Sequence, residues 1–179
     1  MKLPLKVGII ASLIWISIKL IAFSQAISLD DLKPFVFINM FILTAAVSIA
    51  LYLVKKDETE SNFLNDIKNG MLAGVPYAVI VSIFLYLYYE KIYPEFNEKK
   101  VHEIEVKLSN PKTIKEIQKS NSAMENKSPD EIKKDVITKT KMIYNANFTM
   151  LVSMLSLLLY ATLNSIVISL IFRRIIFRN

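Results

Sequence analysis

The sequence predicts an all-α protein: a polytopic membrane four-helix bundle with a partly helical extracytoplasmic segment between spans 3 and 4. Two observations predict this class. Hydrophobic residues make up 53% of the 179 residues and the mean hydropathy is +0.39, which is high for a soluble domain. The apolar residues are also gathered into four long blocks, and nearly all charged residues lie outside these blocks.

Each block is long enough to cross a bilayer. A hydrocarbon core about 30 Å thick needs roughly 20 helical residues, and lipid offers no partners for backbone polar groups outside a helix. The predicted spans are 7–27, 35–54, 71–89 and 148–172. We therefore expect residues 1–179 to form a single integral membrane domain, with 90–147 as its extracytoplasmic polar segment.

The first span has a second interpretation. The short basic start, Met1–Lys6, and the small residues of Ser24-Gln25-Ala26 resemble a secretory signal and its cleavage site. Lys19 and the length of the apolar block argue against this interpretation. Cleavage would leave three spans without changing the orientation of the rest.

Basic residues in the short flanks predict the orientation. If the N-terminus lies in the cytoplasm, the flanks on the cytoplasmic side contain eight basic residues: Lys2, Lys6, Lys55, Lys56, Lys68, Arg173, Arg174 and Arg178. The first outer loop contains Lys33 alone. We therefore expect both termini in the cytoplasm. The net charge of +6 reflects this topology, and without a basic face bearing aromatic residues it predicts no nucleic-acid partner.

The outer segment contains one strand-like pattern. His102–Leu108 alternates polar and apolar residues, as a half-buried strand does. No other stretch could pair with it, so we expect it to be irregular or to pair with another molecule. Because large apolar residues are few, we expect no core within this segment.

Two helix starts are also visible in the outer segment. Asn110-Pro111 predicts a short helix that contains Ile114 and Ile117. Ser128-Pro129-Asp130-Glu131 has the residues of a capping box, and the helix that it begins is expected to continue into the fourth span. The stretch between them, Ser120–Lys127, is polar and predicted to be mobile.

Small residues recur every four positions at the third span. Gly70, Gly74, Ala78 and Ser82 share one helix face, where another backbone can approach closely. This pattern predicts helix packing inside the bundle, and a contact between two copies of the chain is the alternative.

Lys19 is the one ionisable residue within a span, and such residues are functional candidates. Its helix face also contains Gly8, Ser12, Trp15 and Ala22, so it should point into the bundle. The fourth span offers a matching polar stripe, consisting of Ser153, Ser156, Tyr160 and Asn164. Lys19 is then either a structural lysine bonded to hydroxyls, carbonyls or water, or part of an anion site, a lipid-headgroup contact or a gate.

The composition excludes most enzyme chemistry within one chain. With no cysteine and His102 as the only histidine, neither a zinc site nor a Ser-His-Asp or Cys-His arrangement can form. Three glycines provide no phosphate-binding loop. We therefore expect no catalytic residue, cofactor or metal site, and nothing indicates a small-molecule substrate.

The residues around the third span carry a resemblance. Asp66-Ile67-Lys68-Asn69-Gly70, the tyrosine-rich apolar run and Ile92-Tyr93-Pro94-Glu95-Phe96 resemble a bacterial family of small four-span membrane proteins, catalogued only as a domain of unknown function. The likeness covers nearly the whole chain. It implies a location in the bacterial inner membrane, four spans and no known cofactor.

Two functions fit these observations. The first is a non-catalytic accessory or interaction protein of the lipid bilayer, which binds a protein partner or itself through the outer segment or the small-residue face. The alternative is a small transporter or pore, with Lys19 and the polar stripe of the fourth span in its pathway.

Overall fold

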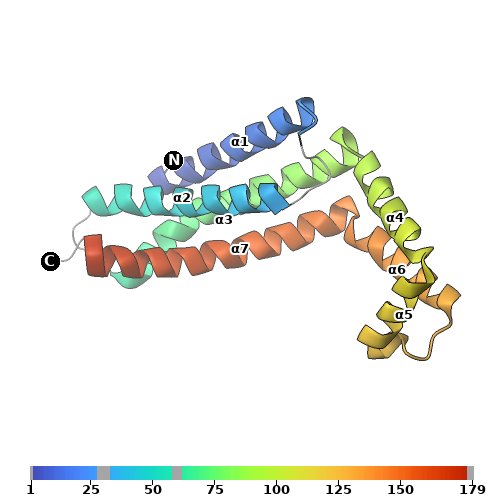
Figure 1. Cartoon of the computed structure of the whole chain (residues 1–179). Coiled ribbons are helices and arrows are strands. Elements are labelled where there is room, and N and C mark those ends of the chain that lie inside the picture. The colour runs from blue at the N-terminus through green and yellow to red at the C-terminus, as the bar shows by residue number, and fades with distance from the viewer. Residues whose placement is uncertain (1, 28–32, 58–61, 177–179) are drawn as a thin grey trace. The chain divides into compact units, whose positions relative to one another are not determined.

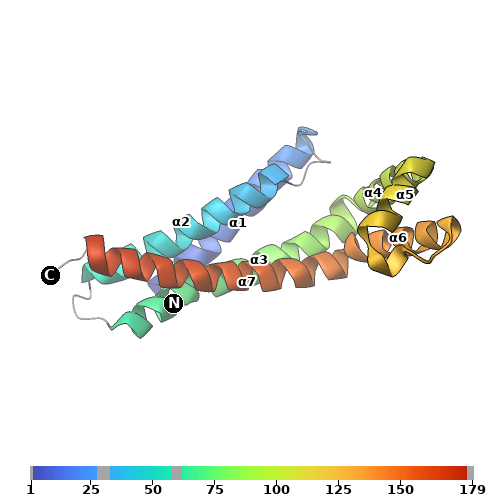
Figure 2. The same ribbon diagram turned by 60° about the horizontal axis from the view of Figure 1, so that its bottom comes forward.

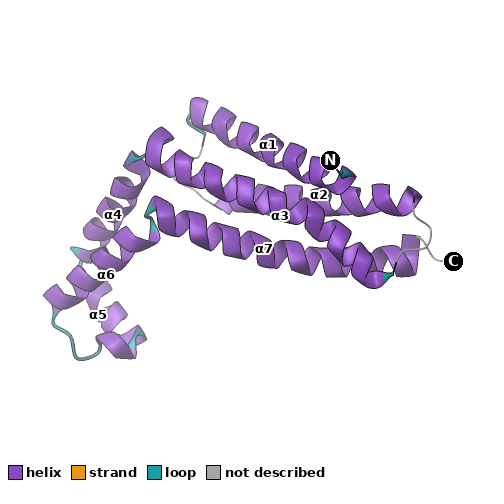
Figure 3. Ribbon diagram, turned by 180° about the vertical axis from the view of Figure 1, so that it is seen from behind, coloured by secondary structure: helices purple, strands orange, loops and turns teal. Residues whose placement is uncertain are grey.

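The computed structural model describes residues 2–27, 33–57 and 62–176, and its regular elements are all helices (Figure 3). The α-helices are α1 Leu3–Ser24, α2 Lys33–Asp57, α3 Phe63–Leu87, α4 Glu95–Leu108, α5 Pro111–Ser120, α6 Pro129–Ile143 and α7 Ala146–Ile171. Short π-helical turns follow α3 at Tyr88–Ile92 and α7 at Phe172–Ile176, and a 3₁₀ turn lies at Ser122–Met124. The predicted all-α class is confirmed.

Four of these helices, α1, α2, α3 and α7, are long and apolar enough to cross a membrane (Figure 1). They coincide with the four predicted spans. The main difference is at α3, which begins eight residues before the predicted boundary at residue 71. Its first two turns contain Asp66 and Lys68, so these turns lie outside the uncharged block that defines the predicted span.

The chain divides into two compact units, and unit 1 consists of Met1–Phe84 and Leu151–Asn179. Within it the long helices pack along one another. α1 closely approaches α3 at Gly8, where a Cβ atom would lie 2.1 Å from the carbonyl oxygen of Ala73. The Tyr77 hydroxyl donates to Asn39 Oδ1 at 2.5 Å and so joins α3 to α2. Close backbone approach and hydrogen bonds between helices thus hold unit 1 together.

Unit 2 consists of Leu85–Met150 and contains α4, α5 and α6, which lie side by side (Figure 2). The core of this unit is formed by Leu108, Ile114, Met124 and Ile132, with Ile104, Ile117, Val136 and Ile137 packed against it. The expectation that this segment lacks a core is wrong. Its apolar residues are few, but three short helices and the turn that contains Met124 bring them together. Ser120–Lys127 therefore supplies a core residue.

The expectation of a strand or an irregular segment at His102–Leu108 is also wrong, because these residues lie in α4. Val101 and Leu108 are buried, and Ile104 packs against the same core. Their spacing of three and four residues is the helical period. Val106 completes the apparent alternation, yet it is 59% exposed and points away from this core.

Both predicted helix starts are confirmed. Ser128 and Glu131 form a capping box, in which Glu131 Oε2 accepts a hydrogen bond from the Ser128 N–H at 2.8 Å and Ser128 Oγ accepts one from the Glu131 N–H at 3.3 Å. At α5, Asn110 Oδ1 accepts from the Lys112 N–H at 3.0 Å. These side chains satisfy N–H groups that have no partner inside a helix.

The helix that begins at Ser128 does not continue into the fourth span, contrary to expectation. α6 ends at Ile143 and α7 begins at Ala146. Between them, Asn145 Oδ1 accepts a hydrogen bond from the Asn147 N–H at 2.9 Å. An asparagine in this position caps a new helix, which separates the two elements.

Candidate functional site

The small-residue face of α3 is occupied within the chain. Ala78 and Ser82 are fully buried, and Gly70 and Gly74 are buried as well. A Cβ atom at Gly70 would lie 2.6 Å from Ser165 Oγ, and one at Gly74 would lie 2.6 Å from the Cβ of Ala161. Both glycines therefore face α7 and allow it to approach α3 closely.

Lys19 lies in the predicted stripe of α1, whose members Gly8, Ser12, Trp15 and Ala22 are buried with it. Its side chain is 2% exposed, and its Nζ lies 3.7 Å from the centroid of the Phe35 ring. The Trp15 Nε1–H donates to the Phe35 carbonyl oxygen at 3.4 Å. Lys19 and Trp15 thus both meet the first turn of α2, where the aromatic face stabilises the ammonium group.

The polar residues of α7 meet α2 at a different place. Thr44 Oγ1 lies 3.0 Å from the Tyr160 hydroxyl and 3.1 Å from Asn164 Oδ1. Thr44 follows Phe35 by nine residues, which is about 13 Å along a helix. The structure therefore brings Tyr160 and Asn164 together with Thr44, but at a level of α2 well removed from the ammonium group of Lys19.

The serines of the same predicted set do not join this cluster. Ser153 is half-buried, and Ser156 is exposed. The four residues lie along one side of α7, as their spacing of three and four predicts, and Tyr160 and Asn164 are the pair that contacts Thr44.

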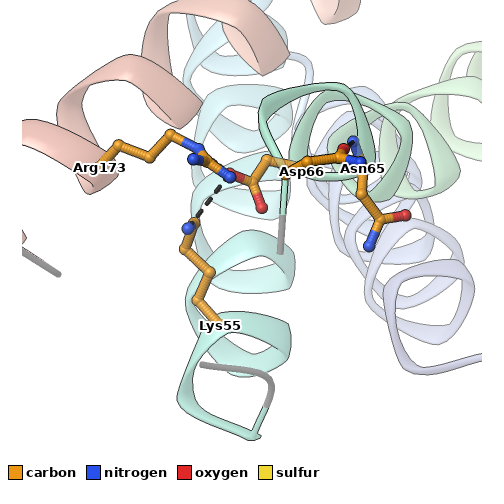
Figure 4. Close-up of polar contacts among 5 residues, drawn as sticks. Lys55, Asn65, Asp66 and Arg173 are labelled. Carbon is orange, nitrogen blue, oxygen red and sulfur yellow. Dashed lines mark hydrogen bonds and ion pairs between the residues drawn. The ribbon is translucent and has the colours of Figure 1, made fainter. Parts of the chain in front are cut away.

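An ion cluster that the sequence did not predict lies at one end of unit 1 (Figure 4). Asp66, in the first turn of α3, is 1% exposed. Its Oδ2 accepts a hydrogen bond from Arg173 Nε at 2.6 Å and lies 3.1 Å from Lys55 Nζ. One carboxylate therefore joins the end of α2, the start of α3 and the π-helical turn after α7.

The orientation rule does not predict this cluster, because it treats basic residues near span ends, such as Lys55 and Arg173, as topology signals. In the sequence, Asp66 is singled out only as part of the family resemblance. A usable signal was nevertheless present. Asp66 lies inside the start of an apolar helix, and the predicted topology places two basic span ends on its side of the membrane. A buried carboxylate in that setting requires cationic partners.

Unit 2 has a groove between α4 and α6 with a volume of about 530 Å³. Its lining residues are Pro94, Asn97, Glu98, Val101, His102, Glu105, Lys141 and Asn145. Asn97 Oδ1 is buried and has no hydrogen-bond partner among the described residues. Glu98 and Glu105 are exposed at the same groove. Buried acceptors in folded proteins are nearly always satisfied by protein groups or ordered water, so Asn97 Oδ1 has the capacity to accept a hydrogen bond from water or from a bound group.

The arrangement of these side chains limits what the groove can do chemically. His102 Nδ1 lies 3.9 Å from Glu105 Oε2, but both side chains are largely exposed, at 77% and 45%. Within residues 2–27, 33–57 and 62–176, no three His, Cys, Asp or Glu side chains are placed to hold a metal ion. The groove offers hydrogen-bond acceptors, negative charge and an apolar floor at Val101, which suit binding.

One known protein family accounts for nearly all of this sequence. The family described as "Protein of unknown function (DUF4199)" matches residues 6–174. The chain belongs to this family. The predicted resemblance to a family of unknown function is thereby confirmed. No curated protein and no solved structure matches the chain.

The DUF4199 match includes both units, so the unit 2 groove is part of the family region. It also includes Lys19 and the three members of the Asp66 cluster. The family description assigns no activity to any of these residues, and their roles rest on the geometry above.

Proposed function

We propose that this DUF4199 protein is a non-catalytic, multi-pass protein of the bacterial inner (cytoplasmic) membrane, which binds a protein partner through the α4–α6 groove of unit 2. The single observation that carries this proposal is the unsatisfied Asn97 Oδ1 in a groove with carboxylates at Glu98 and Glu105. In this topology both termini lie in the cytoplasm and unit 2 lies on the other side of the membrane.

The core of unit 2 supports a binding role because it fixes the groove walls. α4 contributes Ile104 and Leu108 to this core, and α6 contributes Ile132 and Val136. This packing holds the two helices against each other. A preformed groove loses less conformational entropy on binding than a segment that must first fold.

The groove chemistry supports one class of partner. Two carboxylates and a buried amide oxygen accept hydrogen bonds, and Val101 offers an apolar surface beside them. A lysine or arginine next to an apolar side chain, on a protein segment outside the membrane, would satisfy all three groups. We therefore infer a partner with a basic, partly apolar segment.

The transporter or pore alternative has weaker support from the geometry. A pathway through Lys19 requires polar groups from the fourth span beside its ammonium group, but Tyr160 and Asn164 meet α2 at Thr44 instead. The Phe35 ring lies over the ammonium group and can stabilise it, which supports a structural role for Lys19. Self-association through the α3 glycines is likewise less supported, because α7 already occupies that face.

Site-specific photo-crosslinking in native membranes tests the proposed function. A photoreactive residue in place of His102, at the groove, should give an adduct with a protein that has a basic segment. The same residue in place of Glu116, an exposed position of α5 outside the groove, should not. Charge reversal of the rim by Glu98→Lys and Glu105→Lys should abolish the adduct, because two attractions become repulsions.

Three results would contradict the proposal. They are the absence of any adduct from position 102, equal crosslinking from position 116, and an adduct that persists after charge reversal. The fold of the reversed variant is checked by its circular dichroism, since both carboxylates are exposed and their replacement should leave the core of unit 2 intact.

A further inference from the structure

A polar cleft opens in unit 1 where α1 begins, α2 ends and α3 begins. Its volume is about 390 Å³. The residues that line it are Lys2, Leu3, Pro4, Val54, Asn65, Lys68, Asn69 and Leu72. Two ammonium groups and two side-chain amides therefore converge on one cleft, and the described residues that line it include no carboxylate.

An apolar groove of about 500 Å³ continues from this cleft between α1 and α3. It is lined by Leu5, Lys68, Met71, Leu72, Val75, Pro76, Val79 and Ile80. Lys68 and Leu72 belong to both linings, so the cleft and the groove are adjoining parts of one feature. Apart from Lys68, the side chains of the described residues that line the groove are all apolar.

The dimensions of the groove fit one leaflet of a bilayer. From Lys68 to Ile80 the helix advances twelve residues, or about 18 Å. Half of a hydrocarbon core is about 15 Å thick. An acyl chain that lies along the groove, starting at Lys68, would therefore reach close to the bilayer centre.

The lysines of the cleft are available to an anion, unlike the cations of the Asp66 cluster. Lys55 and Arg173 contact the Asp66 carboxylate. Lys2 and Lys68 take part in none of the ion pairs among residues 2–27, 33–57 and 62–176, and both are exposed. The cleft therefore carries two positive charges beside an apolar surface.

We propose that this feature binds an anionic phospholipid of the adjoining leaflet. Lys2 and Lys68 bind its phosphate, and the amides of Asn65 and Asn69 donate hydrogen bonds to the headgroup. One acyl chain lies along the groove against Val75 and its neighbours. Basic pockets between membrane helices recognise anionic lipid headgroups in this manner, and the adjoining apolar groove distinguishes a lipid from a free anion.

Native mass spectrometry of the full-length protein, delipidated in detergent, tests the headgroup part of the site. We compare phosphatidylglycerol with phosphatidylcholine of the same acyl chains. Wild type should retain phosphatidylglycerol preferentially, and Lys68→Gln and Lys2→Gln should each weaken this retention about fivefold. The matched control is Lys56→Gln, an exposed lysine of the same unit that does not line the cleft. An equal loss in the control variant would overturn the proposal.

A second pair of variants tests the acyl-chain part of the site without changing any charge. Val75→Trp fills the groove and should weaken retention of phosphatidylglycerol. Ile83→Trp, on an exposed face of α3 outside the groove, should not. Soluble glycerol phosphate should compete poorly with the lipid, because it lacks the acyl chains. Unchanged retention in Val75→Trp, or full competition by glycerol phosphate, would show that the cleft is an anion site and not a lipid site.

Discussion

The carboxylate of Asp66 connects three segments of unit 1 that are far apart in the sequence. Lys55 and Arg173 both contact the same oxygen atom of this side chain, which is 1% exposed. Removal of one partner from a buried ion pair leaves an uncompensated charge, which costs more free energy than the pair itself provides. Asp66 is thus the residue of unit 1 at which a single polar substitution should have the largest effect.

We predict that Asp66→Asn lowers the free energy of unfolding in detergent by about 3–5 kcal/mol, because Lys55 then stays buried without its carboxylate. The fluorescence of Trp15, the single tryptophan, reports unfolding of unit 1 during denaturation.

The control is Glu90→Gln, which neutralises a carboxylate that is 45% exposed and should change the stability by less than about 1 kcal/mol. Equal stabilities of Asp66→Asn and wild type would show that the cluster contributes nothing to the fold.

For single residues, the sequence predicted which side chains are buried better than it predicted which residues they contact. The helical period placed Lys19 on a buried stripe, and the structure confirms that burial. Its position over Phe35 depends on how α1 and α2 cross, which no local pattern records. For the Asp66 cluster the sequence signals that a buried carboxylate needs cationic partners, but the choice of Lys55 and Arg173 depends on the packing of three helices.

Among the elements, the four long helices were predictable and the short ones only in part. In a bilayer, a long apolar block can satisfy its backbone hydrogen bonds only as a helix, so the length of each block was enough to predict a span. Capping residues also have a local signature, and Ser128 and Asn110 begin helices as predicted. The heptapeptide His102–Leu108 fits both a strand and a helix, and only the core of unit 2 decides between them.

The capping box of α6 should make the stability of unit 2 depend on pH. The hydrogen bond from the Ser128 backbone holds the pKa of Glu131 below its ordinary value of 4.5. A lowered carboxyl pKa means that the folded state binds fewer protons than the unfolded state. The extra stability is therefore present above about pH 4.5 and is lost as the pH falls through the lowered pKa.

Hydrogen exchange of α6 measures this dependence. We predict that the protection factors of its first turns, which correct for intrinsic exchange rates, fall between pH 7 and the acid range. Glutamine at the same position keeps the capping hydrogen bond but cannot titrate, so Glu131→Gln should lose less protection in acid. Glu116→Gln, on α5, serves as the control and should behave as wild type. An equal loss in Glu131→Gln and wild type would contradict the assigned role of the capping carboxylate.

The composition of the whole molecule is an average over two parts that differ in charge and hydrophobicity. Residues 90–147 contain twelve lysines and ten acidic residues, whereas the four predicted spans contain Lys19 as their single charge. The structure assigns the charged part a core of its own, formed from apolar residues on separate short helices. Such a core depends on non-local contacts, so the sequence patterns that found the spans did not find it.

We propose that α1, α2, α3 and α7 span the inner membrane, with unit 2 on the outer side. Cysteine labelling tests it directly, because the chain contains no cysteine and any introduced thiol is unique. Glu116→Cys reports on unit 2, and Lys56→Cys reports on the C-terminal end of α2. Both positions are exposed. With a membrane-impermeant maleimide on intact spheroplasts, we predict that Glu116→Cys is labelled and that Lys56→Cys is labelled only after permeabilisation. Labelling of Lys56→Cys but not Glu116→Cys in intact spheroplasts would contradict the account.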